Sequence, residues 1–513
     1  IGNNTPIAIT LPTIGQEFNA DPSLLQWFVA AYPLSSGCLL LVCGRLADLY
    51  GRKKAYLLGT LMTAAFSLGV GFANNITTLI ILRAMQGIGA ATTVTASLGI
   101  LATSFPPSRT RSLAFATFNA GAPIGAVFGS AVGGVLTEKT APTWRSVFYV
   151  FTGINVICML GGMLSIDKDV SNTAEEKKVD WLGAFLITAG LVLILFVLGE
   201  GETKGWATGY IIALLVIGVL LVCIFVYWQW FLEQAVNRRH AKAEVVSSDE
   251  SQETEREKGL VGRLVDRWCN KLPPPVMKLS IWARANGRFS AVMVMAVLDC
   301  SAFFAWTFWV QLYYQDYTHL KPLEVVVRLL PMSVTGVLCT AFVGLMAAYI
   351  PMIVISLAGT LGTAGACILF AVINPKTTYW AFGFPATVLS VFGADLIFAA
   401  GSLYIAKIAL PHEQSLAAAL FQTMVQLGTS LGVTISTVVF DRVSLSLAQG
   451  EDNIRAYRAA QWTTTAFGLA ASLLVLVAFR GVGVPGDLKQ KSDPPKDEEE
   501  PRTSSPDGKT EED

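Results

Sequence analysis

Charged residues are scarce in this sequence. Only 14% of its 513 residues are Asp, Glu, Lys or Arg, and acidic and basic residues are equal in number, so the net charge is zero. Soluble domains carry about 25% charged residues. The deficit argues against a soluble globular protein, and the zero net charge gives no electrostatic basis for a nucleic-acid partner.

Motifs for metal, nucleotide and disulfide chemistry are missing as well. The chain has three histidines and eight cysteines, with no HExxH or CxxC spacing and no Walker loop. Seven of the cysteines fall in apolar runs, where they are expected to act as small core residues. These absences argue against an enzyme, a metal site and transport driven by ATP hydrolysis in this chain. We expect no cofactor.

Long apolar runs are the dominant feature of the sequence. Hydrophobic residues make up 53% of the chain, and runs long enough to cross a bilayer extend from Leu24–Cys43 to Thr463–Phe479. A hydrocarbon core of about 30 Å needs about 20 helical residues. Ile1–Ile14 is shorter, and we interpret it as the outer half of a truncated first helix. The pattern predicts an all-α membrane protein with about fourteen transmembrane helices.

The stretch Gly44–Lys54 is a short basic segment between two apolar runs, and its two glycines would allow a tight turn. With this segment on the cytoplasmic side and the sides alternating, 27 of the 37 Lys and Arg residues are cytoplasmic and 8 lie outside. Basic residues favour the cytoplasmic side. The Glu233–Arg288 loop and the Gly481–Asp513 tail are therefore predicted to be cytoplasmic.

Three motifs in the first half resemble those of the major facilitator superfamily. The first is the loop after the second helix, with Gly44, Leu46, Asp48, Gly51, Arg52 and Lys53 at the family's spacing. An ordinary basic loop is the alternative. In the second motif, Arg83-x-x-Gln86-Gly87-x-Gly89, the resemblance assigns Arg83 to proton coupling, whereas the residues alone also allow a structural arginine bonded to backbone carbonyls.

The third motif resembles the helix-5 pattern of the family's proton antiporters, although Ala122 precedes Pro123 where those usually have Gly-Pro. The repeat that carries it has a glycine at every fourth position, and such spacing makes a ridge of small residues for helix packing. The residues concerned are Gly121, Pro123, Gly125, Gly129 and Gly133. Generic packing of a glycine-rich membrane helix is the alternative.

Two carboxylates lie inside apolar runs, where ionisable residues are costly and mark functional sites. Asp299 sits near the middle of Phe289–Tyr313 and is the first candidate for a proton carrier, with Asp395 in Tyr379–Ala406 as the second. A hydrogen bond to a neighbouring helix is the other reading of Asp299. Further polar or aromatic candidates to line a substrate cavity are Gln86, Asn119, Trp306, Gln422 and Gln426. Buried amides also bridge helices.

The motifs together resemble the fourteen-spanner drug:proton antiporter branch of that superfamily, and the second half is similar to fungal aminotriazole-resistance transporters. The resemblance implies two six-helix bundles, residues 1–166 and 289–480, joined by two extra helices in 167–232, a loop in 233–288 and a tail in 481–513. It places Asp48 near Leu410–Glu413 when the inner gate is closed, and substrate near the midplane.

The expected function is proton-coupled export of small organic compounds by a monomer in the plasma membrane or the vacuolar membrane. Uptake or facilitated diffusion of a nutrient, and a transporter-like sensor, are the alternatives. Within the central loop, Leu260–Trp268 has one apolar face. This face predicts either a helix on the membrane surface or a disordered linker, and the composition of Gly481–Asp513 predicts disorder.

Overall fold

The computed structural model describes residues 5–19, 22–105, 109–167, 179–246, 273–320, 322–346, 349–410, 413–446 and 453–480. Their elements in the first half are α1 (Thr5–Phe18), α2 (Pro22–Tyr50), α3 (Arg52–Phe72), α4 (Ile76–Ser104), α5 (Arg109–Lys139), α6 (Arg145–Ser165), α7 (Trp181–Lys204) and α8 (Gly209–Val246). Those in the second half are α11 (Ser280–Ala283), α12 (Arg288–Leu312), the π-helical turn η2 (Tyr313–Tyr317), α13 (Pro322–Met346), α14 (Met352–Ala371), α15 (Tyr379–Ile408), α16 (Gln414–Ser446) and α17 (Ile454–Ala478).

Within these described ranges, 13 helices are long and apolar enough to cross a membrane, from Trp27–Tyr50 to Ile454–Ala478. The 14-residue α1 precedes them. The prediction of an all-α membrane protein is confirmed. The predicted surface helix Leu260–Trp268 and the Gly481–Asp513 tail lie outside the described residues.

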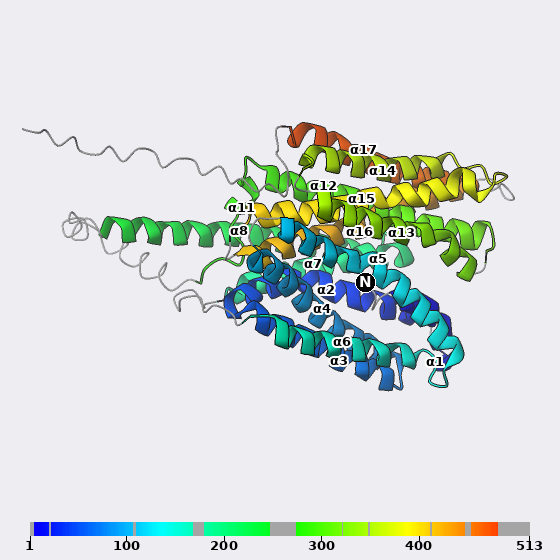
Figure 1. Ribbon diagram of the computed structural model, residues 1–513, viewed down its shortest axis with the longest axis horizontal. Helices are drawn as coiled ribbons and strands as arrows, with labels where there is room; N and C mark the ends of the chain where they lie inside the picture. Colours follow the sequence, from blue (N-terminus) through cyan, green and yellow to red (C-terminus); the bar gives the residue numbers. More distant parts are fainter. Residues whose placement is uncertain are drawn as a thin grey trace, which may run out of the picture.

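The helices form two halves, and several helix pairs join one half to the other. In Figure 1, α3 and α6 lie along one edge of the molecule and α14 and α17 along the opposite edge. Between the edges, α2 packs against α16 and α5 packs against α13. Each of these pairs joins a helix of the first half to a helix of the second.

The extra helices α7 and α8 pack on each other, and α7 also contacts α2 and α16. Phe196 of α7 stacks on Trp27 of α2 at 5.2 Å between ring centroids, and Thr434 of α16 donates a hydrogen bond to the Leu198 carbonyl at 3.0 Å. α7 therefore touches both halves. At 1.5 Å per residue the 38-residue α8 is about 57 Å long, and it projects beyond the bundle (Figure 1).

Two predicted boundaries are wrong. Gly44 is not part of a turn, because α2 continues through it to Tyr50 and only Gly51, with a φ of 112°, breaks the helix before α3 begins at Arg52. The loop predicted to start at Glu233 starts later, because α8 continues to Val246. In both cases helical hydrogen bonding continues into the charged residues beyond the apolar run.

α1 is fixed to α6 at the end of the molecule opposite to Gly51. The Glu17 carboxylate accepts hydrogen bonds from Trp144 Nε1 and Arg145 Nη1, both at 2.6 Å. Burial works against the ionised form of Glu17, but these hydrogen bonds and the positive charge of Arg145 lower its pKa below the ordinary value.

Candidate functional site: an interhelical gate and membrane-embedded carboxylates

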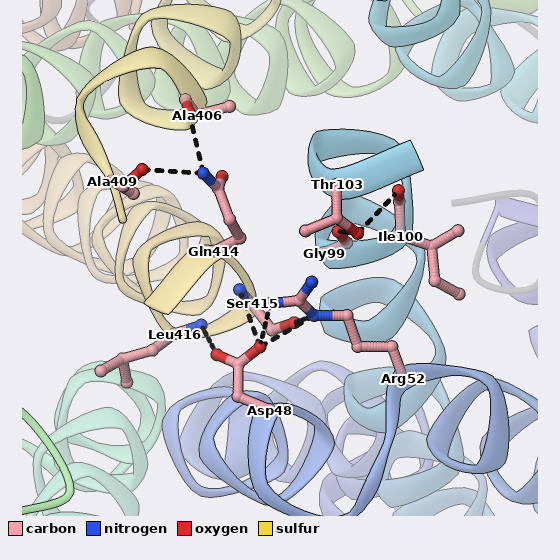
Figure 2. Close-up of polar contacts among 10 residues, drawn as sticks. All are labelled: Asp48, Arg52, Gly99, Ile100, Thr103, Ala406, Ala409, Gln414, Ser415 and Leu416. Carbon is pink, nitrogen blue, oxygen red and sulfur yellow. Dashed lines mark hydrogen bonds and ion pairs between the residues drawn. The ribbon is translucent and has the colours of Figure 1, made fainter. Parts of the chain in front are cut away.

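Asp48, near the end of α2, binds the first turn of α16. Its Oδ2 accepts a hydrogen bond from the backbone N–H of Leu416 at 3.0 Å, and its Oδ1 accepts one from the N–H of Ser415 at 3.4 Å (Figure 2). A helix N-terminus has unsatisfied N–H groups and a positive dipole end, so it favours a carboxylate. The expectation that Asp48 meets the start of this helix is confirmed, although its partners follow Leu410–Glu413.

Arg52 completes the contact from the first turn of α3. Its Nη2 and Nε lie 2.7 and 2.9 Å from Asp48 Oδ1, and Nε also donates to Ser415 Oγ at 3.0 Å. The Asp48 side chain is only 1% exposed. Charge-assisted hydrogen bonds between groups withdrawn from water are stronger than neutral ones, so this pair holds α2, α3 and α16 together. We call Asp48, Arg52, Ser415 and Leu416 the gate.

Two glycines let the helices approach closely at the gate. A Cβ on Gly44 would lie 2.8 Å from the Cβ of Ala419 and 2.9 Å from the Ser415 carbonyl oxygen. A Cβ on Gly99 of α4 would lie 1.9 Å from Ser415 Oγ. Any side chain at either position would therefore push α16 away. Gly44 therefore lies beside the gate through this close contact and not through a turn.

A second set of contacts joins α5 of the first half to α15 of the second half, at the same end of the molecule as the gate. Arg111 donates to the Ala406 carbonyl at 2.8 Å, and Asn119 Nδ2 lies 3.4 Å from Ser402 Oγ. A small cavity lies next to them, lined by Leu98, Ala102, Phe115, Ser402, Ile405, Ala406, Gln414, Ala418 and Phe421. The cavity is enclosed between α4, α5, α15 and α16, directly behind the gate.

Arg83 and Gln86 pair with each other inside the first half. Both are fully buried, Arg83 Nη1 donates to Gln86 Oε1 at 2.7 Å, and the guanidinium carbon lies 4.5 Å from the ring centroid of Tyr32. An aromatic face and an amide oxygen both stabilise a buried guanidinium. These contacts hold the Arg83 side chain of α4 against Tyr32 of α2.

Asp299 of α12 is fully buried within the second half. A Cβ on Gly393 of α15 would lie 2.8 Å from Asp299 Oδ1 and 1.5 Å from Thr363 Oγ1 of α14, so the two oxygens occupy space that only glycine leaves free. Within the described part of the chain, neither oxygen of the Asp299 carboxyl makes a well-formed hydrogen bond, and the Thr363 hydroxyl is the polar group that lies beside it. A buried charge without a partner is costly, and this environment therefore suits a carboxyl group that takes up a proton.

Asp395 of α15 has a different environment. It is half-buried, and a Cβ on Gly336 of α13 would lie 2.5 Å from its Oδ2 and 3.0 Å from the Cβ of Pro123 of α5. Asp395 therefore lies where a helix of the first half meets two helices of the second. The two predicted proton-carrier candidates are not in one place: Asp299 is inside the second half and Asp395 is at the junction of the halves.

The remaining sequence candidates are dispersed. Trp306 is fully buried and packs edge-on against Phe370 at 5.6 Å. Gln426 is half-buried beside Gly37 of α2, whose Cβ position lies 3.4 Å from Gln426 Cγ. Gln422, one turn earlier on α16, is also half-buried.

The predicted glycine ridge on α5 holds only in part. Pro123, Gly129 and Gly133 are buried and Gly125 is half-buried, whereas Gly121 is exposed and a Cβ there would meet no atom within 4 Å. The prediction that Gly121 is a packing position is wrong, because this position of α5 faces open space.

The sequence pattern of the Major Facilitator Superfamily matches residues 1–199 and 351–509. The chain belongs to the major facilitator superfamily. The match covers most of the chain and includes both partners of the gate, α2 with the start of α3 and the start of α16. The resemblance inferred from the motifs is confirmed.

The names of the relatives point to different functions. The chain is 25% identical to the efflux pump terJ of Aspergillus terreus (91% of this chain, 83% of the relative). It is 26% identical to a low affinity ammonium transporter of Saccharomyces cerevisiae (85% and 77%). To the aminotriazole resistance protein of S. cerevisiae it is 30% identical over 220 residues (42% and 41%).

Among solved structures, the human organic anion transporter MFSD10 superposes with a TM-score of 0.58 at 12% identity, covering 91% of this chain and 88% of that one. At this identity the likeness establishes the fold. Membership of the family places the chain among membrane transporters.

Proposed function

We propose that the chain is a secondary active transporter that exports small organic compounds in exchange for protons by alternating access. It would act as a monomer, in the plasma membrane or the vacuolar membrane, with the gate at the cytoplasmic face. The observation that carries the proposal is the gate, in which Asp48 and Arg52 bind the N-terminus of a helix more than 360 residues away through a few polar contacts.

A few polar contacts between helix ends can break and re-form in each transport cycle. The gate is held by hydrogen bonds between helix ends, and Gly44 and Gly99 let the helices approach closely beside it. Rocking of residues 1–166 against 289–480 would therefore break the contacts of the gate without unfolding a helix. Because α7 touches both α2 and α16, the extra helices of 167–232 would guide this motion. In the closed state, substrate near the midplane would reach only the opposite side.

Proton coupling is assigned to Asp299, with Asp395 and Arg83 as further participants. The fully buried carboxyl of Asp299, beside the Thr363 hydroxyl, suits reversible protonation, and the half-buried Asp395 lies at the junction where the two halves would separate. Substrate would contact the side chains near that junction. From the earlier candidates, Gln422 and Gln426 on α16 remain our choice for this role, together with Gln86, Asn119 and Trp306 if the motion exposes them.

Two of the relatives' names support export, and a third supports a second candidate function. An efflux pump and a resistance protein favour removal of organic compounds. The similarity to a low affinity ammonium transporter favours uptake or facilitated diffusion of a small nutrient as the second candidate.

The purified full chain in liposomes tests the proposal. With an acid interior, it should accumulate radiolabelled aminotriazole or at least one of a panel of fluorescent dyes, and a protonophore should abolish accumulation. Methylammonium that equilibrates without regard to the pH gradient would favour the second candidate. Transport no faster than in protein-free liposomes, for every compound, would contradict both. On intact cells, external protease should leave the segment between Val246 of α8 and Arg288 of α12 uncut, since we place it in the cytoplasm.

A further inference from the structure

Residues 276–284, which lead from the central loop into α12, lie across the gate end of the molecule. We call this segment the strap. Val276, Met277 and Ile281 of the strap are 2%, 5% and 1% exposed, so its apolar side chains are part of the core. The segment is therefore a packed element and not a loose connection, although it contains only the four-residue helix α11.

One side of the strap is bound to α8. The Glu233 carboxylate accepts hydrogen bonds from the N–H groups of Leu279 at 2.7 Å and Ser280 at 3.3 Å, and Gln229 Oε1 accepts one from Met277 N–H at 3.1 Å. Both acceptors are buried, at 9% and 0% exposure. A buried donor left without its acceptor is costly, so these bonds fix the strap to α8.

The same contact extends to α7. Gln229 Nε2 donates to Asp180 Oδ2 at 2.8 Å, and Asp180 caps α7 by accepting the Gly183 N–H at 2.9 Å. Trp228 Nε1 donates to the Asp180 carboxylate as well, at 3.1 Å. The strap is thus joined to both extra helices through one connected set of buried hydrogen bonds.

The other side of the strap is bound to the start of α16. Arg284 Nη1 lies 3.0 Å and Lys278 Nζ 3.6 Å from the carboxylate of Glu413, whose side chain is 4% exposed. Glu413 directly precedes α16 and stands two residues before Ser415, the residue that Asp48 and Arg52 bind. Because the chain is continuous over these residues, displacing Glu413 also displaces the N–H groups that Asp48 uses.

We propose that the strap couples the extra helix pair α7–α8 to the gate, by holding the first turn of α16 where Asp48 and Arg52 reach it. Glu233, Arg284 and Glu413 are then positioning residues for the gate. Opening the gate requires the strap either to leave α8 or to carry α8 with it, so the extra helices take part in gating. This inference rests on the proposed gating function and goes beyond it.

The test follows access to the cavity behind the gate. A cysteine at Ala418, which lines this cavity, is labelled with a membrane-impermeant maleimide added to the gate face of membrane vesicles, and labelling of the parent protein is subtracted. Arg284→Ala and Glu233→Gln should each raise the labelling rate about fivefold or more, the size of a typical coupling between sites. Arg284→Lys should restore most of the closed state.

Arg238→Ala is the matched control, because Arg238 is an exposed arginine on α8 and takes part in none of the strap contacts described above. It should change the labelling rate less than twofold. Unchanged labelling in both Arg284→Ala and Glu233→Gln, or an equal rise in Arg238→Ala, would overturn the proposal. If Arg284→Ala does not fold, Glu233→Gln decides alone. Labelling needs no substrate, so failure of the strap and failure of the transport function are separate results.

Discussion

Replacing Asp299 by Asn is expected to abolish accumulation of substrate against its gradient while sparing movement down a gradient. The variant keeps the size of the side chain and removes the group that gains and loses a proton. Thr363 and Gly393 leave just enough room for a carboxyl group, and an amide of the same shape fits there. Because an amide does not titrate, no proton gradient can be coupled through it.

The measurement is the uphill accumulation of substrate in liposomes with an imposed pH gradient, compared with counterflow exchange at equal pH. Accumulation should fall to the level of protein-free liposomes, and exchange should stay within about threefold of the parent. Asp441→Asn is the matched control, since Asp441 is an exposed acidic residue on α16 and its replacement should change neither quantity.

If Asp299→Asn still concentrates substrate at the parent's rate, Asp299 is structural. Asp395 at the junction of the halves then becomes the proton carrier to test by the same replacement. If Asp395→Asn also retains full accumulation, the assignment of proton coupling to a carboxylate of the second half is wrong.

Replacing Asp48 by Asn is expected to lower the turnover number about tenfold with little change in substrate affinity. A carboxylate at a helix N-terminus contributes about 0.3–1 kcal/mol, and up to ~2 kcal/mol when partly buried. A tenfold change in rate corresponds to about 1.4 kcal/mol, which lies within that range. Affinity should be spared because the gate lies at one end of the helices and substrate near their middle.

Turnover and half-saturating substrate concentration, measured from initial rates over a range of substrate concentrations, separate the two effects. Lys54→Gln is the control, because Lys54 is an exposed residue of the same basic segment, and both quantities should stay near the parent's. A large loss of affinity with normal turnover would show that Asp48 acts on substrate binding and not on the gate.

Local patterns made much of the fold predictable. Apolar runs of about 20 residues identify membrane helices whichever neighbours those helices pack against. The motif of Asp48, Gly51 and Arg52 is also local, because its residues are close together in the sequence. The same reasoning failed for Gly44, because a glycine that opens a turn and a glycine that admits a neighbouring helix look alike in sequence. Only the close approach of Ser415 and Ala419 to Gly44 in the structure shows that this glycine admits a neighbouring helix.

Contacts between distant segments were not predictable. Gly99 and Ser415 meet at the gate although they are more than 300 residues apart, and Arg111 reaches the Ala406 carbonyl from a comparable distance. A single sequence carries no signal for such pairs. The strap was missed for the same reason, since Glu233, Arg284 and Glu413 read separately as charges at the ends of membrane helices. The placement of Asp299 and Asp395 likewise depends on which helices surround them.

A disulfide across the gate tests the central claim most directly, namely that α2 and α16 must separate during each transport cycle. A Cβ on Gly44 would lie 2.8 Å from the Cβ of Ala419 and 2.9 Å from the Ser415 carbonyl oxygen, so a cysteine there pushes α16 slightly away. Disulfides need about 3.8 Å between the two Cβ atoms, so a displacement of about 1 Å in that direction admits the bond between cysteines at Gly44 and Ala419.

The measurement is substrate transport by the Gly44→Cys, Ala419→Cys protein in liposomes before oxidation, after oxidation and after reduction, with each single variant treated in the same way. The account predicts that transport stops when the cross-link forms and returns when it is reduced, while the single variants do not respond. Undiminished transport by fully cross-linked protein would contradict it.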